Sequence, residues 1–227
     1  MKKLLLFSII SIFTINISLS QNITNKQFSL FNYELEISDE FRQETSILSS
    51  FINSIETYKN PGDDQLKAIL IHNIYYSIKE TLERKLEIAI LPVNSFQNEI
   101  NYNDYAYPKA SIRKALRKGY SKFYFKVNVK IESLTEEKRE SNPKLFEEIN
   151  GSVTIPQVTI DITIFNKDGI IPVDKWHGKA SANTPLPIDN YLFKGFDRSG
   201  ENTNNKENLS SIKDKAINQL VQNFLNK

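Results

Sequence analysis

A serine and a lysine three positions apart are the residues of this 227-residue chain that could perform hydrolysis. On a helix Ser111 and Lys114 would share one face, as the nucleophile and its neighbouring lysine do in serine enzymes of the penicillin-binding class. Ser181–Asn183 and Lys167–Gly169 imitate the other two motifs of that class, but in reversed order. Because the same serine-to-lysine spacing recurs twice elsewhere in the chain, the pattern does not identify a catalytic site.

Other catalytic signatures are missing from the sequence. It contains two histidines and no cysteine, and it lacks the HExxH, GxSxG and glycine-rich phosphate-binding motifs. Two histidines on separate elements do not suggest a histidine-based metal centre or a catalytic triad. We therefore predict no catalytic residues, no metal site and no cofactor.

The turn sequence Asn166–Gly169 predicts a β-hairpin. Asparagine followed by Lys-Asp-Gly is typical of a type I turn with glycine in the left-handed position. Pairing the strands outward from this turn places Asp161 opposite Lys175 in a cross-strand ion pair. The same register places Ile160 opposite Trp176.

The only tryptophan of the chain, Trp176, stands next to His177 within this hairpin. Adjacent strand residues point to opposite faces of a sheet, so the two side chains cannot share a site. We expect Trp176 in the core beside Gly178. We expect His177 on the surface, between two lysines.

A basic segment is the clearest electrostatic feature of the sequence. Between Tyr105 and Lys130 there are eight basic residues, no acidic residue and several interleaved tyrosines. Such segments can bind anionic polymers or protein surfaces, although the acidic residues that follow would also balance them as an ordinary solvated surface. The candidate partner-binding residues are Lys109, Arg113, Arg117, Lys122, Lys126 and Lys130. The partner we expect is an envelope protein, an anionic surface polymer or another copy of the chain in a homo-oligomer.

The N-terminus predicts export. Two lysines precede an uncharged apolar stretch, Leu4–Leu19, with small residues up to Ser20, which is the layout of a signal peptide covering residues 1–20. A chain without cysteine fits the bacterial periplasm, and a secreted or outer-membrane-associated location is the alternative. Removing Lys2 and Lys3 leaves 27 of the 29 basic residues, equal to the 27 acidic ones. This neutral chain is not expected to bind nucleic acid, and we expect membrane association only through partners.

The hydrophobic pattern predicts one α/β (α+β) domain at residues 64–227, after an N-terminal extension with a helix at residues 21–63. Its sheet is mixed and mostly antiparallel, with a βαβ crossover, a hairpin, a C-terminal helix and helices on one face. The apolar run Leu86–Val93 reads as a central strand buried on both faces. The polar stretch at about 185–209 reads as a flexible loop.

Five elements follow from periodicity and capping signals. Ser38 begins a helix in the extension, and an apolar stripe from Leu66 predicts a second helix over residues 64–84. Pro108 opens a short helix that ends at Gly119, where a positive φ is expected. The strand Phe123–Glu132 alternates apolar and polar residues and runs parallel to Leu86–Val93. A capping box at Ser211 and Asp214 starts the last helix.

The segments "KLEIAILPVNSF", "IRKALRKGYSKFYFKVNVKI", "VTIDITIFNKDGIIPV" and "AINQLVQNFL" follow each other in an order that resembles a module of bacterial envelope proteins. The families are the periplasmic domain of the curli secretion channel and the N-terminal domain of the Tol translocation protein. The resemblance implies an exported, non-catalytic protein for assembly, docking or scaffolding. The alternative is a small periplasmic hydrolase or ligand-binding protein. In that protein, loops at 94–107 and 185–208 frame a pocket, and Lys114 or Asp161 acts in it.

Overall fold

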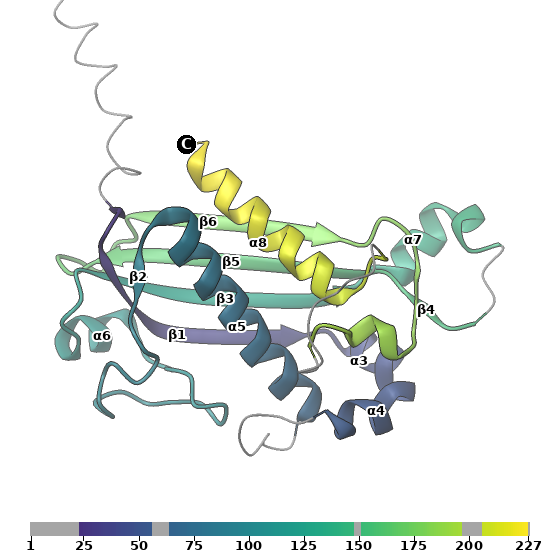
Figure 1. Ribbon diagram of the computed structural model, residues 1–227, viewed down its shortest axis with the longest axis horizontal. Helices are drawn as coiled ribbons and strands as arrows, with labels where there is room; N and C mark the ends of the chain where they lie inside the picture. Colours follow the sequence, from purple (N-terminus) through teal and green to yellow (C-terminus); the bar gives the residue numbers. More distant parts are fainter. Residues whose placement is uncertain (1–22, 56–63, 148–150, 197–205, 227) are drawn as a thin grey trace, which may run out of the picture.

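The computed structural model describes residues 23–55, 64–147, 151–196 and 206–226. A curved β-sheet forms the middle of the molecule, and two long helices cross one of its faces (Figure 1). This arrangement confirms the predicted α+β class. The predicted signal peptide, residues 1–20, lies outside the described residues, and so do residues 197–205 of the predicted flexible loop.

The large sheet has five strands in the order β2-β1-β3-β5-β6. These strands are β1 (Gln27–Ile37), β2 (Ala89–Ile90), β3 (Phe123–Ser133), β5 (Pro156–Asn166) and β6 (Asp174–Ser181). Strand β1 is parallel to β2 and to β3, whereas β3, β5 and β6 pair antiparallel. A second, two-stranded sheet pairs β4 (Val153–Thr154) with β7 (Leu186–Pro187).

The long helices are α5 (Gln65–Leu86) and α8 (Leu209–Leu225). In Figure 1, α8 lies over β5 and β6, and α5 crosses the other half of the same face. The shorter helical segments are α3 (Asp39–Thr45), η1 (Ser46–Leu48), α4 (Ser49–Ser54), α6 (Ile112–Lys118), α7 (Thr135–Ser141), η2 (Pro143–Phe146) and η3 (Asn190–Phe193). Ser38 accepts a hydrogen bond from the backbone N–H of Phe41 and caps α3, as predicted.

The predicted central strand at Leu86–Val93 is wrong. Helix α5 continues to Leu86, Glu87 adopts a left-handed conformation with φ of 52°, and only Ala89–Ile90 pairs as edge strand β2. The central place beside β3 belongs to β1, from the segment predicted to be an extension. Leu86 and Ile90 are nevertheless buried, so this apolar run contributes to the core from a helix end and a short strand.

The inner face of the sheet carries apolar rows that continue from strand to strand. One row joins Tyr33, Val127, Ile162 and Trp176, and the next joins Leu35, Val129, Ile160 and Gly178. All of these residues are buried beneath α5 and α8. The indole of Trp176 contacts the ring of Phe224 on α8, and its Nε1–H donates to Asp174 Oδ2 at 2.7 Å.

Gly178 sets how closely α8 approaches the sheet. A Cβ at this position would lie 2.1 Å from the carbonyl oxygen of Ala216 and 2.7 Å from Cβ of Leu220. Backbone of α8 therefore occupies the space that any side chain on residue 178 would need. This explains the glycine that follows the Trp-His pair.

The hairpin register differs from the prediction by two residues. Trp176 pairs with Ile162, and Asp161 faces His177 instead of Lys175. The β5–β6 pairing begins at Ile164 and Asp174, so the connection is longer than the predicted three-residue turn. Since a shift of two residues keeps each side chain on its own face, the predicted burial of Trp176 and exposure of His177 are confirmed.

Two helix ends also differ from the predictions. Helix α6 starts at Ile112 with Ser111 as its cap, because Pro108 accepts a hydrogen bond from Tyr33 N–H along the edge of β1. Gly119 has φ of −100°, and it is small because a Cβ would meet the rings of Tyr124 and Phe96 within 2.7 Å.

The capping box of α8 consists of Asn208 and Ser211, three residues before the predicted pair. The segment before it is also less loop-like than predicted. It forms β7 and η3 and buries the side chains of Leu192, Phe193 and Phe196.

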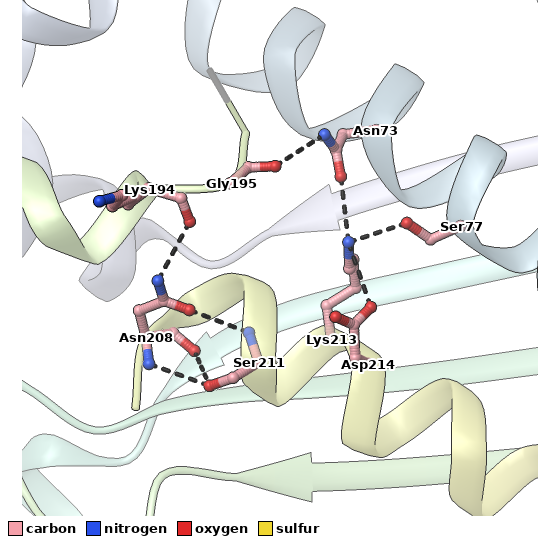
Figure 2. Close-up of polar contacts among 8 residues, drawn as sticks. All are labelled: Asn73, Ser77, Lys194, Gly195, Asn208, Ser211, Lys213 and Asp214. Atoms are coloured by element: carbon pink, nitrogen blue, oxygen red, sulfur yellow. Dashed lines mark hydrogen bonds and ion pairs between the residues drawn. The ribbon is translucent and has the colours of Figure 1, made fainter. Parts of the chain in front are cut away.

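A buried lysine joins the two long helices (Figure 2). The ammonium group of Lys213 on α8 donates to Ser77 Oγ at 2.8 Å and to Asn73 Oδ1 at 3.1 Å, both on α5. Its side chain is only 5% exposed and contacts the exposed carboxylate of Asp214 at 3.3 Å. Asn73 in turn donates to the carbonyl of Gly195, so one network holds α5, α8 and the segment after η3 together.

We predict that Trp176→Ala lowers the free energy of unfolding by roughly 3–5 kcal/mol, because it removes a large buried ring. His177→Ala should lower it by less than about 0.5 kcal/mol, as a half-exposed surface position does. Chemical denaturation of both variants measures the difference. Equal losses in the two variants would contradict the assignment of one residue to the core and the other to the surface.

The second prediction concerns pH. Burial lowers the pKa of Lys213 in the folded protein, although Asp214 partly opposes this shift; in the unfolded chain a lysine titrates near about 10.4. Between these two pKa values the unfolded state binds more protons, so the Lys213 contribution to the free energy of unfolding rises with pH. The stability of the natural protein relative to Lys213→Met should therefore increase as pH approaches about 10.4.

Taking this difference cancels the opposite contribution of the tyrosines. Burial raises the pKa of Tyr33, Tyr75 and Tyr107, so their contribution to stability is lost at high pH in both proteins alike. Urea denaturation at a series of pH values measures the difference. A difference that stays constant with pH would show that Lys213 titrates normally in the folded protein.

Candidate functional site: the polar face and open edge of the sheet

The outer face of the sheet presents three polar rows that run across β1, β3, β5 and β6. The strand register places residues of one row directly beside each other. The rows are Asn32–Lys126–Thr163–Lys175, Glu34–Asn128–Asp161–His177 and Glu36–Lys130–Thr159–Lys179. Each of these residues is partly or fully exposed, so the outer face is available for contact.

The middle row is rich in hydrogen-bond acceptors. Asp161 Oδ1 lies 2.8 Å from His177 Nδ1, and both side chains are 54% exposed. Between Glu34 and Asp161 stands Asn128, whose Oδ1 is buried and has no hydrogen-bond partner among the described residues. Three oxygen-bearing side chains are thus aligned, and the described residues supply no donor to the Asn128 oxygen.

The third row mixes charges of both signs. Lys130 Nζ lies 2.5 Å from Glu132 Oε1, and this hydrogen bond is the main cause of the raised pKa of Lys130. Glu36 and Glu40 raise this pKa further. Lysines and glutamates therefore alternate over a few residues on this face.

The six predicted partner-binding residues do not form one uniform basic patch. Lys126 and Lys130 lie on the outer face, and Lys109 lines hollows shared with each of them. Arg113 and Arg117 are exposed on α6. Lys122 instead lines a hollow of about 270 Å³ beside Trp176 and Phe224.

Further carboxylates near these lysines come from β1, which is predictable as a short strand but whose place beside β3 sequence reasoning missed. The segment "NYELEI" supplies Glu34 and Glu36, and the register inserts them beside Asn128 and Lys130. The alternation of this short segment was a usable signal. The position of this segment next to β3 could not be read from the sequence, because long-range pairing decides which strands are neighbours.

A groove of about 620 Å³ follows the edge of β1 past the outer face. Its floor is formed by Tyr33–Ile37 together with Asn128, Lys130 and Asp161. Residues of the loop before α6 line one end, and Arg42 of α3 and Lys67 of α5 line the groove as well. Arg42 is held by Asp64 through an ion pair of 2.7 Å, which also lowers the pKa of that carboxyl against the effect of its burial.

The loop before α6 is anchored on β1 by one asparagine. Asn103 Oδ1 accepts hydrogen bonds from the N–H groups of Tyr105 and Tyr107, each at 3.0 Å, and its Nδ2 donates to the carbonyl of Tyr33 at 3.4 Å. Tyr33 N–H donates to the carbonyl of Pro108. This loop therefore covers β1 up to Tyr33 and defines where the groove begins.

One end of the outer face is covered. Helix α6 and the preceding loop pack Ala115, Phe96 and Ile100 against Phe31, Tyr124 and Phe165 of the sheet. Beside this cluster lies a second hollow of about 460 Å³ that includes Glu34, Ser111 and Lys126. The covered end and the hollow limit the polar face at the start of β3.

Ser111 and Lys114 act as helix-start residues in this structure. Ser111 Oγ accepts a hydrogen bond from the backbone N–H of Lys114, and Lys114 Nζ lies 3.5 Å from Asn101 Oδ1. The lysine amine is thus directed to an asparagine and the serine hydroxyl to the backbone. This geometry is that of a capped helix, and it does not support the hydrolase alternative. Within the described ranges no group of three acidic, histidine or cysteine residues could hold a metal ion.

No model of a known protein family matches the chain, and no curated protein matches its sequence. The solved structures to which the chain is similar include the following three. A hypothetical protein of Chlamydia trachomatis is 10% identical, with 89% of this chain and 95% of that chain covered and a TM-score of 0.36. A Helicobacter pylori protein described as a neuraminyllactose-binding hemagglutinin homologue is 10% identical, with 94% and 91% covered and a TM-score of 0.37.

The third, a Xanthomonas campestris protein of the DUF330 family, is 9% identical, with 89% and 79% covered and a TM-score of 0.31. At these identities and TM-scores the likenesses bear on neither family nor function. None of the helices in the described part of the chain has the length and hydrophobicity of a membrane span.

We predict that Ser111→Ala lowers the free energy of unfolding by about 1 kcal/mol, because α6 loses its cap. Ser111→Asp should restore this loss, since aspartate is an equally good cap at the start of a helix. Thermal or chemical denaturation of the two variants measures both changes. If aspartate failed to restore stability, the hydroxyl of Ser111 would have a role other than capping.

Proposed function

We propose that this chain is an exported cell-envelope protein that acts without catalysis, as an interaction, assembly or scaffolding module. The observation that carries the proposal is the outer face of the sheet, where four strands align polar and charged side chains in rows. In the described part of the chain, no helix covers these rows beyond the α6 end. A face with fixed rows of donors and acceptors suits a matching protein surface. Export rests on the signal peptide predicted at residues 1–20.

The order of charges favours a protein partner over an anionic polymer. Lys126 and Lys130 stand in rows on either side of the row that holds Glu34 and Asp161. A polyanion bound to the lysines would lie next to the carboxylates of the middle row, and these like charges would repel each other. An envelope protein can place an acidic residue at each lysine and a basic residue at each carboxylate.

The sequence predicted a purely basic contact surface. In the present proposal Lys126 and Lys130 still contact the partner, but the surface also includes the carboxylates of Glu34 and Asp161. The resemblance of the element order to the curli-channel and Tol modules stays a prediction, and it points to the same kind of work. Another copy of the chain is the competing partner for this face.

We predict that charge reversal at Lys126 and Lys130 weakens capture of the partner. The tagged protein is expressed in its own cells, crosslinked and purified, and the captured proteins are compared between the natural chain and the Lys126→Glu/Lys130→Glu variant. The difference should be larger at low salt, because exposed charges are screened at high ionic strength.

The matched control is Lys138→Glu/Lys144→Glu, which reverses two exposed lysines on α7 and η2, outside the rows of the face. It should capture the same proteins as the natural chain. If reversal on the face and reversal in the control had the same effect, the outer face would not be the contact surface. Capture of the untagged chain itself would identify the homo-oligomer.

A further inference from the structure

The two edges of the large sheet are treated differently. At the β6 edge, α8 supplies side chains that satisfy the backbone: Gln219 Oε1 accepts from Lys179 N–H at 2.7 Å. Asn223 Nδ2 donates to the carbonyl of His177 at 2.9 Å. These two contacts hinder the pairing of β6 with another chain at His177 and Lys179.

At the opposite edge, β1 is covered only in part. Strand β2 pairs with its beginning, and the loop before α6 bonds to Phe31 and Tyr33. The backbone N–H and C=O groups of successive strand residues point alternately to the two neighbouring strands. Those of Leu35 and Ile37 therefore point away from β3, as those of Tyr33 do. Among the described residues no strand pairs with β1 on this side beyond Tyr33, and the groove of about 620 Å³ runs along this stretch.

The groove offers a definite chemistry to an added strand. On the outer side it presents Glu34 and Glu36, two residues apart, with the unpaired Asn128 oxygen one strand further in. On the inner side it presents the ring of Tyr105, which Lys67 approaches at 5.8 Å. Carboxylates and an orphan carbonyl oxygen call for donors, and an arginine is long enough to lie over Glu34 and reach Asn128.

We propose that this open edge binds an extended segment of a partner protein as an added β-strand, with arginine or lysine at alternate positions above Glu34 and Glu36. Main-chain hydrogen bonds to Leu35 and Ile37 hold the segment, and apolar residues between the basic ones face Tyr105. Strand addition at this edge extends the proposed function and takes one assumption from it, namely that the partner is a protein.

A second copy of β1 fits this edge poorly. Antiparallel pairing about a two-fold axis at Leu35 would set Glu34 opposite Glu36 of the other copy, twice on the same face. Centring the pair on Glu36 would set the two Glu36 carboxylates opposite each other. Directly opposed like charges destabilise a strand pair, so the carboxylates select a basic segment and disfavour self-pairing.

The test uses the purified protein and three fluorescent five-residue peptides, measured by anisotropy. The first peptide alternates arginine and valine, the second is identical but N-methylated at the amides that would face β1, and the third has glutamate in place of arginine. The first should bind and slow hydrogen exchange at the amides of Leu35 and Ile37. The second and third should bind at least tenfold more weakly, because one lacks the main-chain donors and the other meets Glu34 and Glu36 with like charge.

Variants of the protein complete the design. Glu34→Lys/Glu36→Lys should weaken the arginine peptide at least tenfold, whereas Glu136→Lys/Glu140→Lys on α7 should leave its binding unchanged. Equal binding of the N-methylated peptide, or exchange protection elsewhere in the chain, would overturn strand addition. Concentration-dependent protection of Leu35 and Ile37 without peptide would assign the edge to a second copy. The N-methylated peptide and the exchange at Leu35 and Ile37 report on the edge alone, whereas partner capture by the Lys126 and Lys130 variant reports on the outer face, so failure of one proposal can be told from failure of the other.

Discussion

The cross-strand register of β1, β3, β5 and β6 is the constraint on which the rest of the molecule depends. Side chains alternate between the two faces of a strand, so the register that stacks Leu35, Val129 and Ile160 in the core also fixes what lies opposite them. It aligns Glu34, Asn128 and Asp161 on the outer face. The hydrophobic core and the candidate site are therefore two consequences of one pairing pattern.

The close approach of α8 follows from the same register. Gly178 stands in the row of Leu35, Val129 and Ile160, and its missing side chain lets the backbone of α8 touch the sheet. From this position α8 places Gln219 and Asn223 over the β6 edge and Lys213 against α5. The glycine at position 178 thus sets the distance of α8 from the sheet, and this distance lets α8 side chains bind the backbone of the β6 edge.

Local patterns in the sequence predict faces better than neighbours. The faces of Trp176 and His177 could be derived because parity survives a register error of two residues. Strand β1 could not be placed, since its bulge between Leu30 and Asn32 interrupts the alternation and its partner β3 lies about 95 residues further along the chain. The apolar run Leu86–Val93 was wrongly predicted to be a central strand. Its buried residues belong to a helix end and a two-residue strand, and in the sequence these give the same apolar pattern as a central strand.

The candidate site shows the same division between what is local and what is long-range. The exposure of Lys126 and Lys130 follows from the alternation of β3 alone, whereas their acidic neighbours depend on β1 lying alongside. Natural sheets protect their edges against unwanted pairing, and the β6 edge conforms to that rule. Among the residues that the structure describes, the β1 edge departs from it over a few residues only, directly beside Glu34, Glu36 and the unpaired oxygen of Asn128. The sheet thus has a closed edge at β6 and an open stretch of edge at β1. Because aligned carboxylates lie beside the open stretch, it accepts basic strands and repels acidic ones. This selection by charge makes the open stretch a specific contact site and protects it from aggregation.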